Sequence, residues 1–158
     1  HTTPGSTAAQ REAAFADLYE RFPQSPIVAT NYADYLIKRE ANKDAARIYR
    51  NLLKHWASHI SLWGPEEISQ DELVQSRIVW QLAIELAIGS QLIPLEGQAK
   101  AGRSSEPQLI APLIRKLAER VESQLKNAPD DSRSAKFYAG QVVELKEWAN
   151  KQILAKPE

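Results

Sequence analysis

The stretch PIVATNYADYLIKREANKDAARIYRNLLKHW, residues 26–56, decides the fold of this chain. Pro26 suits the first position of a helix, because its missing N–H would have no intrahelical partner there. Apolar side chains recur at helical spacing on both sides of a short turn near Ala41 and Asn42. A turn this short makes two consecutive helices antiparallel. The stretch therefore predicts a helical hairpin.

Small residues mark where the two helices of this hairpin approach each other. Ala29 and Ala33 lie four residues apart on one face of the first helix, so a neighbouring helix can come close there. The second helix repeats apolar residues at spacings of three and four, which is typical of a half-buried helix. Its apolar positions are Ala45, Ala46, Ile48, Tyr49, Leu52, Leu53 and Trp56.

An internal echo precedes the hairpin. Four apolar residues upstream match four in the second helix of the hairpin, and each matched pair is 34 residues apart. The pairs are Phe15 with Tyr49, Leu18 with Leu52, Tyr19 with Leu53, and Phe22 with Trp56. A spacing of about 34 residues is the period of tetratricopeptide repeats.

Residues 11–57 resemble a tetratricopeptide repeat, or the related half-a-TPR repeat. Ala33, Ala45 and Tyr49 fall on the small, small and aromatic positions of the repeat pattern, although the first of these is usually glycine. Pro23 falls on the proline that follows a second helix. The resemblance implies antiparallel helical hairpins in a right-handed superhelical or bundle arrangement.

The resemblance also implies a binding surface, because the first helix of each such hairpin lines a concave face. The partner-binding residues it indicates are Asn31, Asp34, Tyr35 and Lys38. Tyrosine is a common anchor in protein interfaces. The alternative for Tyr35, which we weigh equally, is that it packs on the next helix.

The rest of the chain predicts further helices, and we expect an all-α fold of about six. We divide it into a flexible lead at 1–7, a hairpin region at 8–58 and C-terminal helices at 66–155 that pack on this region. The irregular, glycine- and serine-containing stretch at 90–106 is expected to be a mobile loop.

One of these helices begins at Ser69 and ends at Ile88. Ser69 and Glu72 form a capping-box pattern. The segment IVWQLAIELAI is apolar on nearly every side, which favours a helix in the centre of a bundle. Gln81 and Glu85 interrupt it, so its apolar run is shorter than the roughly 20 residues of a membrane span. We therefore predict no span.

The last two predicted helices, 107–127 and 131–155, each carry an apolar stripe. Asp131 or Ser132 is expected to cap the second of them. The stripes consist of Leu109, Ile110, Leu113, Ile114, Leu117, Val121 and Leu125, and of Tyr138, Val142, Leu145, Ala149 and Ile153.

Composition limits the function classes. The 158 residues include 20 basic and 20 acidic side chains, and this neutral balance argues against a dedicated nucleic-acid binder. The chain has no cysteine, which excludes disulfides, thiolate metal sites and a cysteine nucleophile, and leaves the compartment open.

Motifs for catalysis are missing from the sequence. It contains neither a P-loop nor a GxSxG nucleophile elbow. His55 and His59 are spaced for one helix face, but no third metal ligand is evident nearby. We therefore predict a protein-binding scaffold or adaptor that is not an enzyme and has no cofactor, no metal and no nucleic-acid partner.

Two alternatives remain open at this stage. One is a structural or oligomerisation domain in which the helices at 107–127 and 131–155 pair with a second copy. The other is a small helical metal protein or enzyme that uses His55 and His59.

Overall fold

The computed structural model describes residues 7–62, 69–88, 106–128 and 133–154. These residues form six helices, so the predicted all-α class is confirmed. The helices are α1 (Ala8–Arg21), α2 (Pro26–Lys38), α3 (Asn42–Trp56), α4 (Gln70–Ile88), α5 (Glu106–Leu125) and α6 (Arg133–Leu154). The predicted caps Asp131 and Ser132, most of the predicted lead and nearly all of the predicted loop at 90–106 lie outside the described residues.

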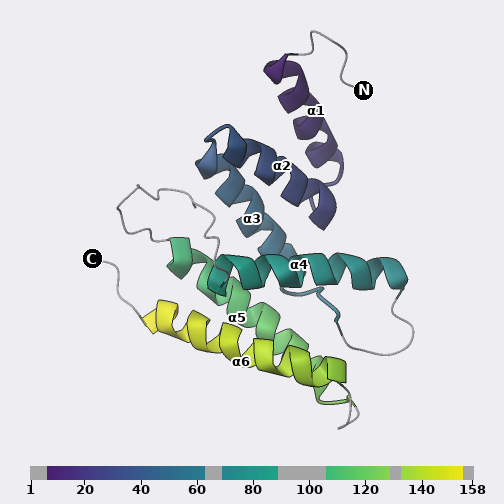
Figure 1. The fold of residues 1–158 in the computed structure, drawn as a ribbon, viewed down its shortest axis with the longest axis vertical. Coiled ribbons are helices and arrows are strands. Elements are labelled where there is room, and N and C mark those ends of the chain that lie inside the picture. Colours follow the sequence, from purple (N-terminus) through teal and green to yellow (C-terminus); the bar gives the residue numbers. More distant parts are fainter. Residues whose placement is uncertain (1–6, 63–68, 89–105, 129–132, 155–158) are drawn as a thin grey trace.

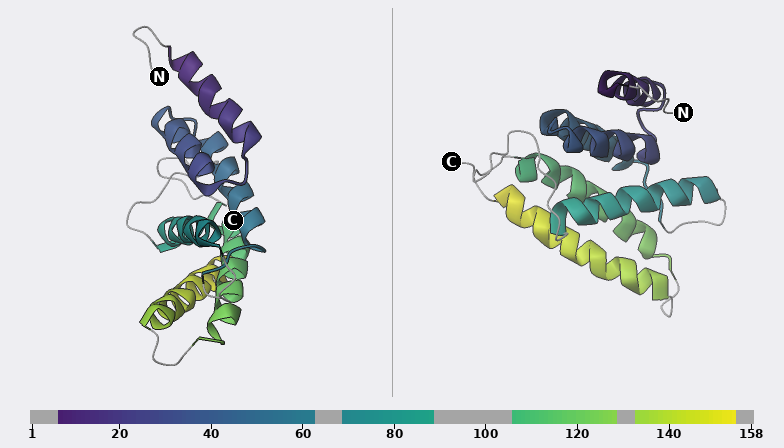
Figure 2. Two further views of the ribbon diagram at one scale, coloured as in Figure 1. Left: turned by 90° about the vertical axis from the view of Figure 1, so that its right-hand side faces the viewer. Right: turned by 45° about the horizontal axis from the view of Figure 1, so that its top comes forward.

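The helices are stacked along the long axis of the molecule, with α1 at one end and the α5–α6 pair at the other (Figure 1). Both further views show α4 crossing between the α2–α3 hairpin and the α5–α6 hairpin (Figure 2). Helix α4 contacts all four of these helices. The prediction that this helix lies centrally is confirmed, and its buried residues include Val79, Trp80 and Ala83.

Side-chain caps fix where three helices begin. Thr7 and Gln10 form a capping box at α1. Ser25 accepts a hydrogen bond from the Val28 N–H at 3.3 Å, directly before Pro26 in α2. Ser69 accepts one from the Glu72 N–H at 3.1 Å, as predicted for α4. Each cap satisfies an N–H that the first helical turn leaves without a partner.

The turn between α2 and α3 is a Schellman motif around Glu40. Its backbone is left-handed, with φ of 63°. The Glu40 N–H donates to the Ile37 carbonyl at 2.9 Å, and the Ala41 N–H donates to the Leu36 carbonyl at 2.8 Å. The chain therefore reverses immediately, and the small residues Ala29 and Ala33 are fully buried in the resulting hairpin.

Helix α1 contacts no described helix except α2, and none of its residues is buried. The two segments related by the 34-residue echo therefore differ in burial. Leu52 and Trp56 of α3 are 1% and 7% exposed, whereas the matching Leu18 of α1 and Phe22 directly after α1 are 43% and 53% exposed. Helix α3 packs on α2, α4 and α5, so its face is covered from several sides.

The apolar stripes predicted on α5 and α6 pack against each other and against α4. Two predicted members are wrong, since Leu109 and Ile153 are exposed. Ile153 lies in the last turn of α6, whereas Leu109 directly precedes the buried Ile110 and so lies at the edge of the covered face of α5. Trp80 of α4 also donates its indole N–H to the Gln141 side chain of α6 at 2.7 Å.

Hydrogen bonds to the segment after α3 link the two hairpins. The Ile60 carbonyl accepts from Arg120 Nε at 2.7 Å and from Gln124 Nε2 at 2.8 Å. Gln124 Oε1 in turn accepts from the Leu62 N–H at 3.0 Å. The buried Ser76 of α4 accepts from the Ser61 N–H at 2.9 Å. This segment is therefore held by α4 and α5.

Candidate functional site

The candidate site is a hollow of about 270 Å³ where α2, α3 and α4 meet. We call it the acidic hollow. It is lined by Thr30 and Asp34 of α2, Tyr49 of α3, and Ile78, Gln81, Leu82 and Glu85 of α4. The lining residues on α4 recur at spacings of three and four, so they share the face that α4 turns towards α2 and α3.

Tyr49 forms the buried part of the acidic hollow. It is 1% exposed, and its hydroxyl donates a hydrogen bond to Asp34 Oδ1 at 3.3 Å. Burial raises the pKa of the Tyr49 hydroxyl, and the negative charge of Asp34, the hydrogen bond to it and the charge of Glu85 raise it further. The phenol is therefore neutral at ordinary pH and remains a hydrogen-bond donor.

The exposed rim carries the charge. Asp34 and Glu85 lie at the surface, and the Gln81 amide donates to Glu85 at 3.5 Å. Thr30 uses its hydroxyl to donate to the Pro26 carbonyl of its own helix at 2.7 Å. The lining thus combines two carboxylates with two aliphatic side chains and contains no basic residue.

Of the four residues that the sequence indicates for partner binding, only Asp34 lines the acidic hollow. Asn31 and Lys38 are exposed on α2. Tyr35 is half-buried and stacks on Phe15 of α1, with 4.8 Å between the ring centroids. Tyr35 therefore has a packing role, but its partner is the preceding helix α1 and not the next helix named in the alternative.

Further contacts around Tyr35 secure α1. Its hydroxyl donates to the Ala8 carbonyl at 3.0 Å. Arg39 of the α2–α3 turn forms an ion pair with Glu12 at 2.6 Å and lies over the Tyr35 ring at 5.8 Å. Tyr35 is therefore part of the α1–α2 contact, and its substitution would disturb α1 itself.

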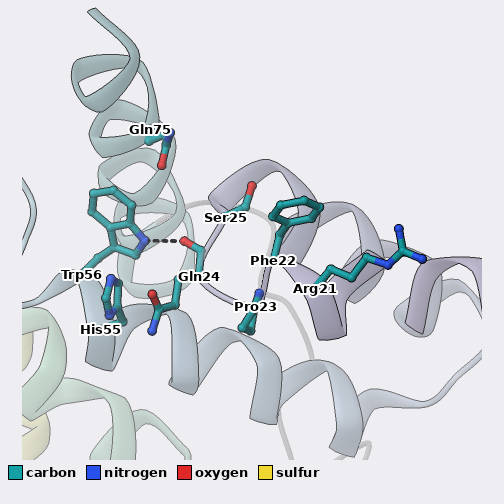
Figure 3. A pocket seen from close by; sticks show the side chains of 8 residues that line it. All are labelled: Arg21, Phe22, Pro23, Gln24, Ser25, His55, Trp56 and Gln75. Carbon is teal, nitrogen blue, oxygen red and sulfur yellow. Dashed lines mark hydrogen bonds between the residues drawn. The ribbon is translucent and has the colours of Figure 1, made fainter. Parts of the chain in front are cut away.

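A second, open hollow of about 490 Å³ lies between the α1–α2 turn, the end of α3 and α4 (Figure 3). Trp56 donates its indole N–H to the Gln24 carbonyl at 2.9 Å across it. Its lining mixes basic, aromatic and neutral polar side chains, and Arg21 is already paired with Asp17 at 3.3 Å. It shows no convergence of one kind of group.

The predicted pair of histidines is stacked. The rings of His55 and His59 are 4.3 Å apart and nearly parallel, and the carbonyl of His55 lies 2.8 Å from His59 Nδ1. Burial, and secondly the nearby His59, lowers the pKa of His55. Within the described part of the chain, no group of three or more His, Cys, Asp or Glu side chains could hold a metal ion.

The contribution of α4 to this site was not predicted from the sequence. Gln81 and Glu85 are polar interruptions, four residues apart, in an otherwise apolar segment. We used them only as evidence against a membrane span, and none of the described helices is long and apolar enough to be one. Two polar residues on one face of a central helix also indicate where that face opens to solvent.

Comparisons with known proteins add no information about the site. No protein-family model, curated protein or solved structure matches this chain.

Proposed function

We propose that this chain is a protein-binding scaffold or adaptor of tetratricopeptide-like type, which holds a segment of another protein between α2 and α4. The observation that carries the proposal is the acidic hollow, with Tyr49 of α3 buried in it and polar and aliphatic groups around it. Pockets for drug-sized molecules measure about 300–1,000 Å³. At about 270 Å³ the acidic hollow suits a side chain of a bound segment better.

The arrangement of helices also supports this proposal. Figure 1 shows α2 and α4 running in the same general direction on either side of α3. Their exposed side chains, such as Asn31 on α2 and Gln81 on α4, give a bound segment further polar contacts. We propose that α1–α3 and α4 together form the superhelical arrangement that the sequence resemblance implies.

The oligomerisation alternative has less support. It pairs α5 and α6 with a second copy, and most residues of their apolar stripes are buried within a single chain. Pairing through those buried residues would require the two helices to separate. A second copy would instead have to pack on their exposed apolar residues, such as Leu109, Phe137 and Val143.

Selection of phage-displayed random 12-residue peptides on the immobilised full chain tests the proposed function. We expect peptides that bind the wild type and bind Gln81→Trp about tenfold more weakly, because the indole would obstruct the hollow. Glu144→Trp, at an exposed position of α6, is the matched control and should bind normally. Failure to select peptides, or equal binding to all three proteins, would contradict the proposal.

A further inference from the structure

Within the described part of the chain, no basic side chain balances the charges in the acidic hollow. Asp34 and Glu85 reach it from two different helices, and neither forms an ion pair with any described residue. Lys38 lies one helical turn beyond Asp34 and is exposed, but it is not among the lining residues. An interface with such a surplus of negative charge favours a positively charged partner group.

The other lining groups suit a long basic side chain. Ile78 and Leu82 give an aliphatic wall, against which the methylene groups of lysine or arginine can pack while the charged end reaches a carboxylate. The buried hydroxyl of Tyr49 bonds to Asp34, which orients that carboxylate. The hollow thus pairs an apolar wall with an anionic rim, which matches the two parts of such a side chain.

Other occupants fit less well. Phosphate groups of nucleic acid would be repelled by the two carboxylates. A calcium ion takes six to eight oxygen ligands, and two side-chain carboxylates do not approach that number. A neutral apolar side chain would leave both carboxylates uncompensated.

We propose that the acidic hollow binds a lysine or arginine side chain presented by a segment of a partner protein. This inference rests on the proposed function and specifies the chemistry of the segment. The aliphatic stem lies along Ile78 and Leu82, and the charged group lies between Asp34 and Glu85.

The selected peptides test this inference directly. We expect lysine or arginine to be enriched in them relative to the unselected library. Replacing the enriched lysine of a synthetic peptide by norleucine, or an enriched arginine by citrulline, should weaken binding about tenfold. The double variant Asp34→Asn/Glu85→Gln should weaken binding of the basic peptide to a similar degree. It should leave binding of the neutral peptide, which carries norleucine or citrulline in place of the basic residue, nearly unchanged.

A matched control separates local from long-range charge effects. Glu144→Gln/Glu147→Gln changes the net charge by the same amount at exposed positions of α6 and should bind the basic peptide like the wild type. Asp34→Asn keeps an oxygen that can accept the Tyr49 hydrogen bond, so the hollow should keep its shape.

The outcomes distinguish the two proposals. Suppose the selected peptides bind Gln81→Trp more weakly than the wild type, but are not enriched in basic residues and bind Asp34→Asn/Glu85→Gln normally. That result would overturn this inference and leave the proposed function standing. Spermidine is the competitor that tests for a small polyamine. If it displaces the basic peptide at a concentration no higher than the peptide concentration required for binding, the occupant is a small polyamine and this inference is overturned. Failure to select any peptide would contradict both.

Discussion

At the scale of single residues, Glu40 shows how one backbone conformation closes the α2–α3 hairpin. Its φ of 63° is uncommon for a residue with a side chain, because Cβ comes close to the following carbonyl oxygen. We expect Glu40→Gly to be more stable than Glu40→Ala by about 0.5–1 kcal/mol, since relief of this strain exceeds the additional unfolded-state entropy of glycine. Urea denaturation of both variants measures the difference.

Lys54, exposed within α3, is the control position for Glu40. There the order should reverse, with Lys54→Gly about 1 kcal/mol less stable than Lys54→Ala, because the backbone is an ordinary helix. Equal stabilities of the two Glu40 variants would mean that the turn is not strained at this residue.

At the scale of elements, α1 is the helix most easily detached. Among the described helices it packs on α2 alone, with its aromatic side chains in the contact, and it buries no residue completely. Tyr35→Ala removes the stacking on Phe15 and the hydrogen bond to the Ala8 carbonyl. Each contact contributes about 0.5–1.5 kcal/mol, so hydrogen exchange of the α1 amides should accelerate about tenfold or more.

Exchange in α5 and α6 is the internal reference for this experiment, because local opening of α1 leaves those helices packed. Phe137→Ala, which removes an exposed aromatic side chain of α6, should leave α1 exchange unchanged. If Tyr35→Ala accelerated exchange equally in all helices, α1 would be part of a single cooperative unit.

At the scale of the whole molecule, Gln124 couples the two hairpins. Its side chain bonds both to the Ile60 carbonyl and to the Leu62 N–H, and both of these residues are buried. Gln124→Ala leaves that N–H without its acceptor, so we expect the free energy of unfolding to fall by about 1–3 kcal/mol. Circular dichroism and tryptophan fluorescence should then give unfolding transitions that no longer coincide.

Lys126→Ala, an exposed substitution two residues after Gln124, is the comparison for Gln124→Ala. It should change stability by less than about 0.5 kcal/mol and keep the two transitions together. A Gln124→Ala protein with the stability of the wild type would show that the segment after α3 is held by other contacts.

The sequence by itself determined the local structure. Pro26, Ser69 and the spacing of apolar residues marked where helices begin and which faces are buried, because capping and helical periodicity act over a few residues. Ala29, Ala33 and Tyr49 were correctly taken as hairpin packing positions, and all three are buried. The exposed Leu109 shows the limit of this reasoning, because it directly precedes the buried Ile110 and periodicity does not reveal how wide the covered face of a helix is.

Only the tertiary structure decided which faces remain open. Phe22 and Trp56 occupy matching positions in the sequence, yet one is exposed and the other buried, because α3 contacts three described helices and α1 contacts one. Likewise, Tyr35 packs on α1, whereas Asp34, one residue earlier, lines the acidic hollow together with Glu85. Burial depends on neighbours that are distant in the chain, and the pattern of residues within one helix does not contain that information.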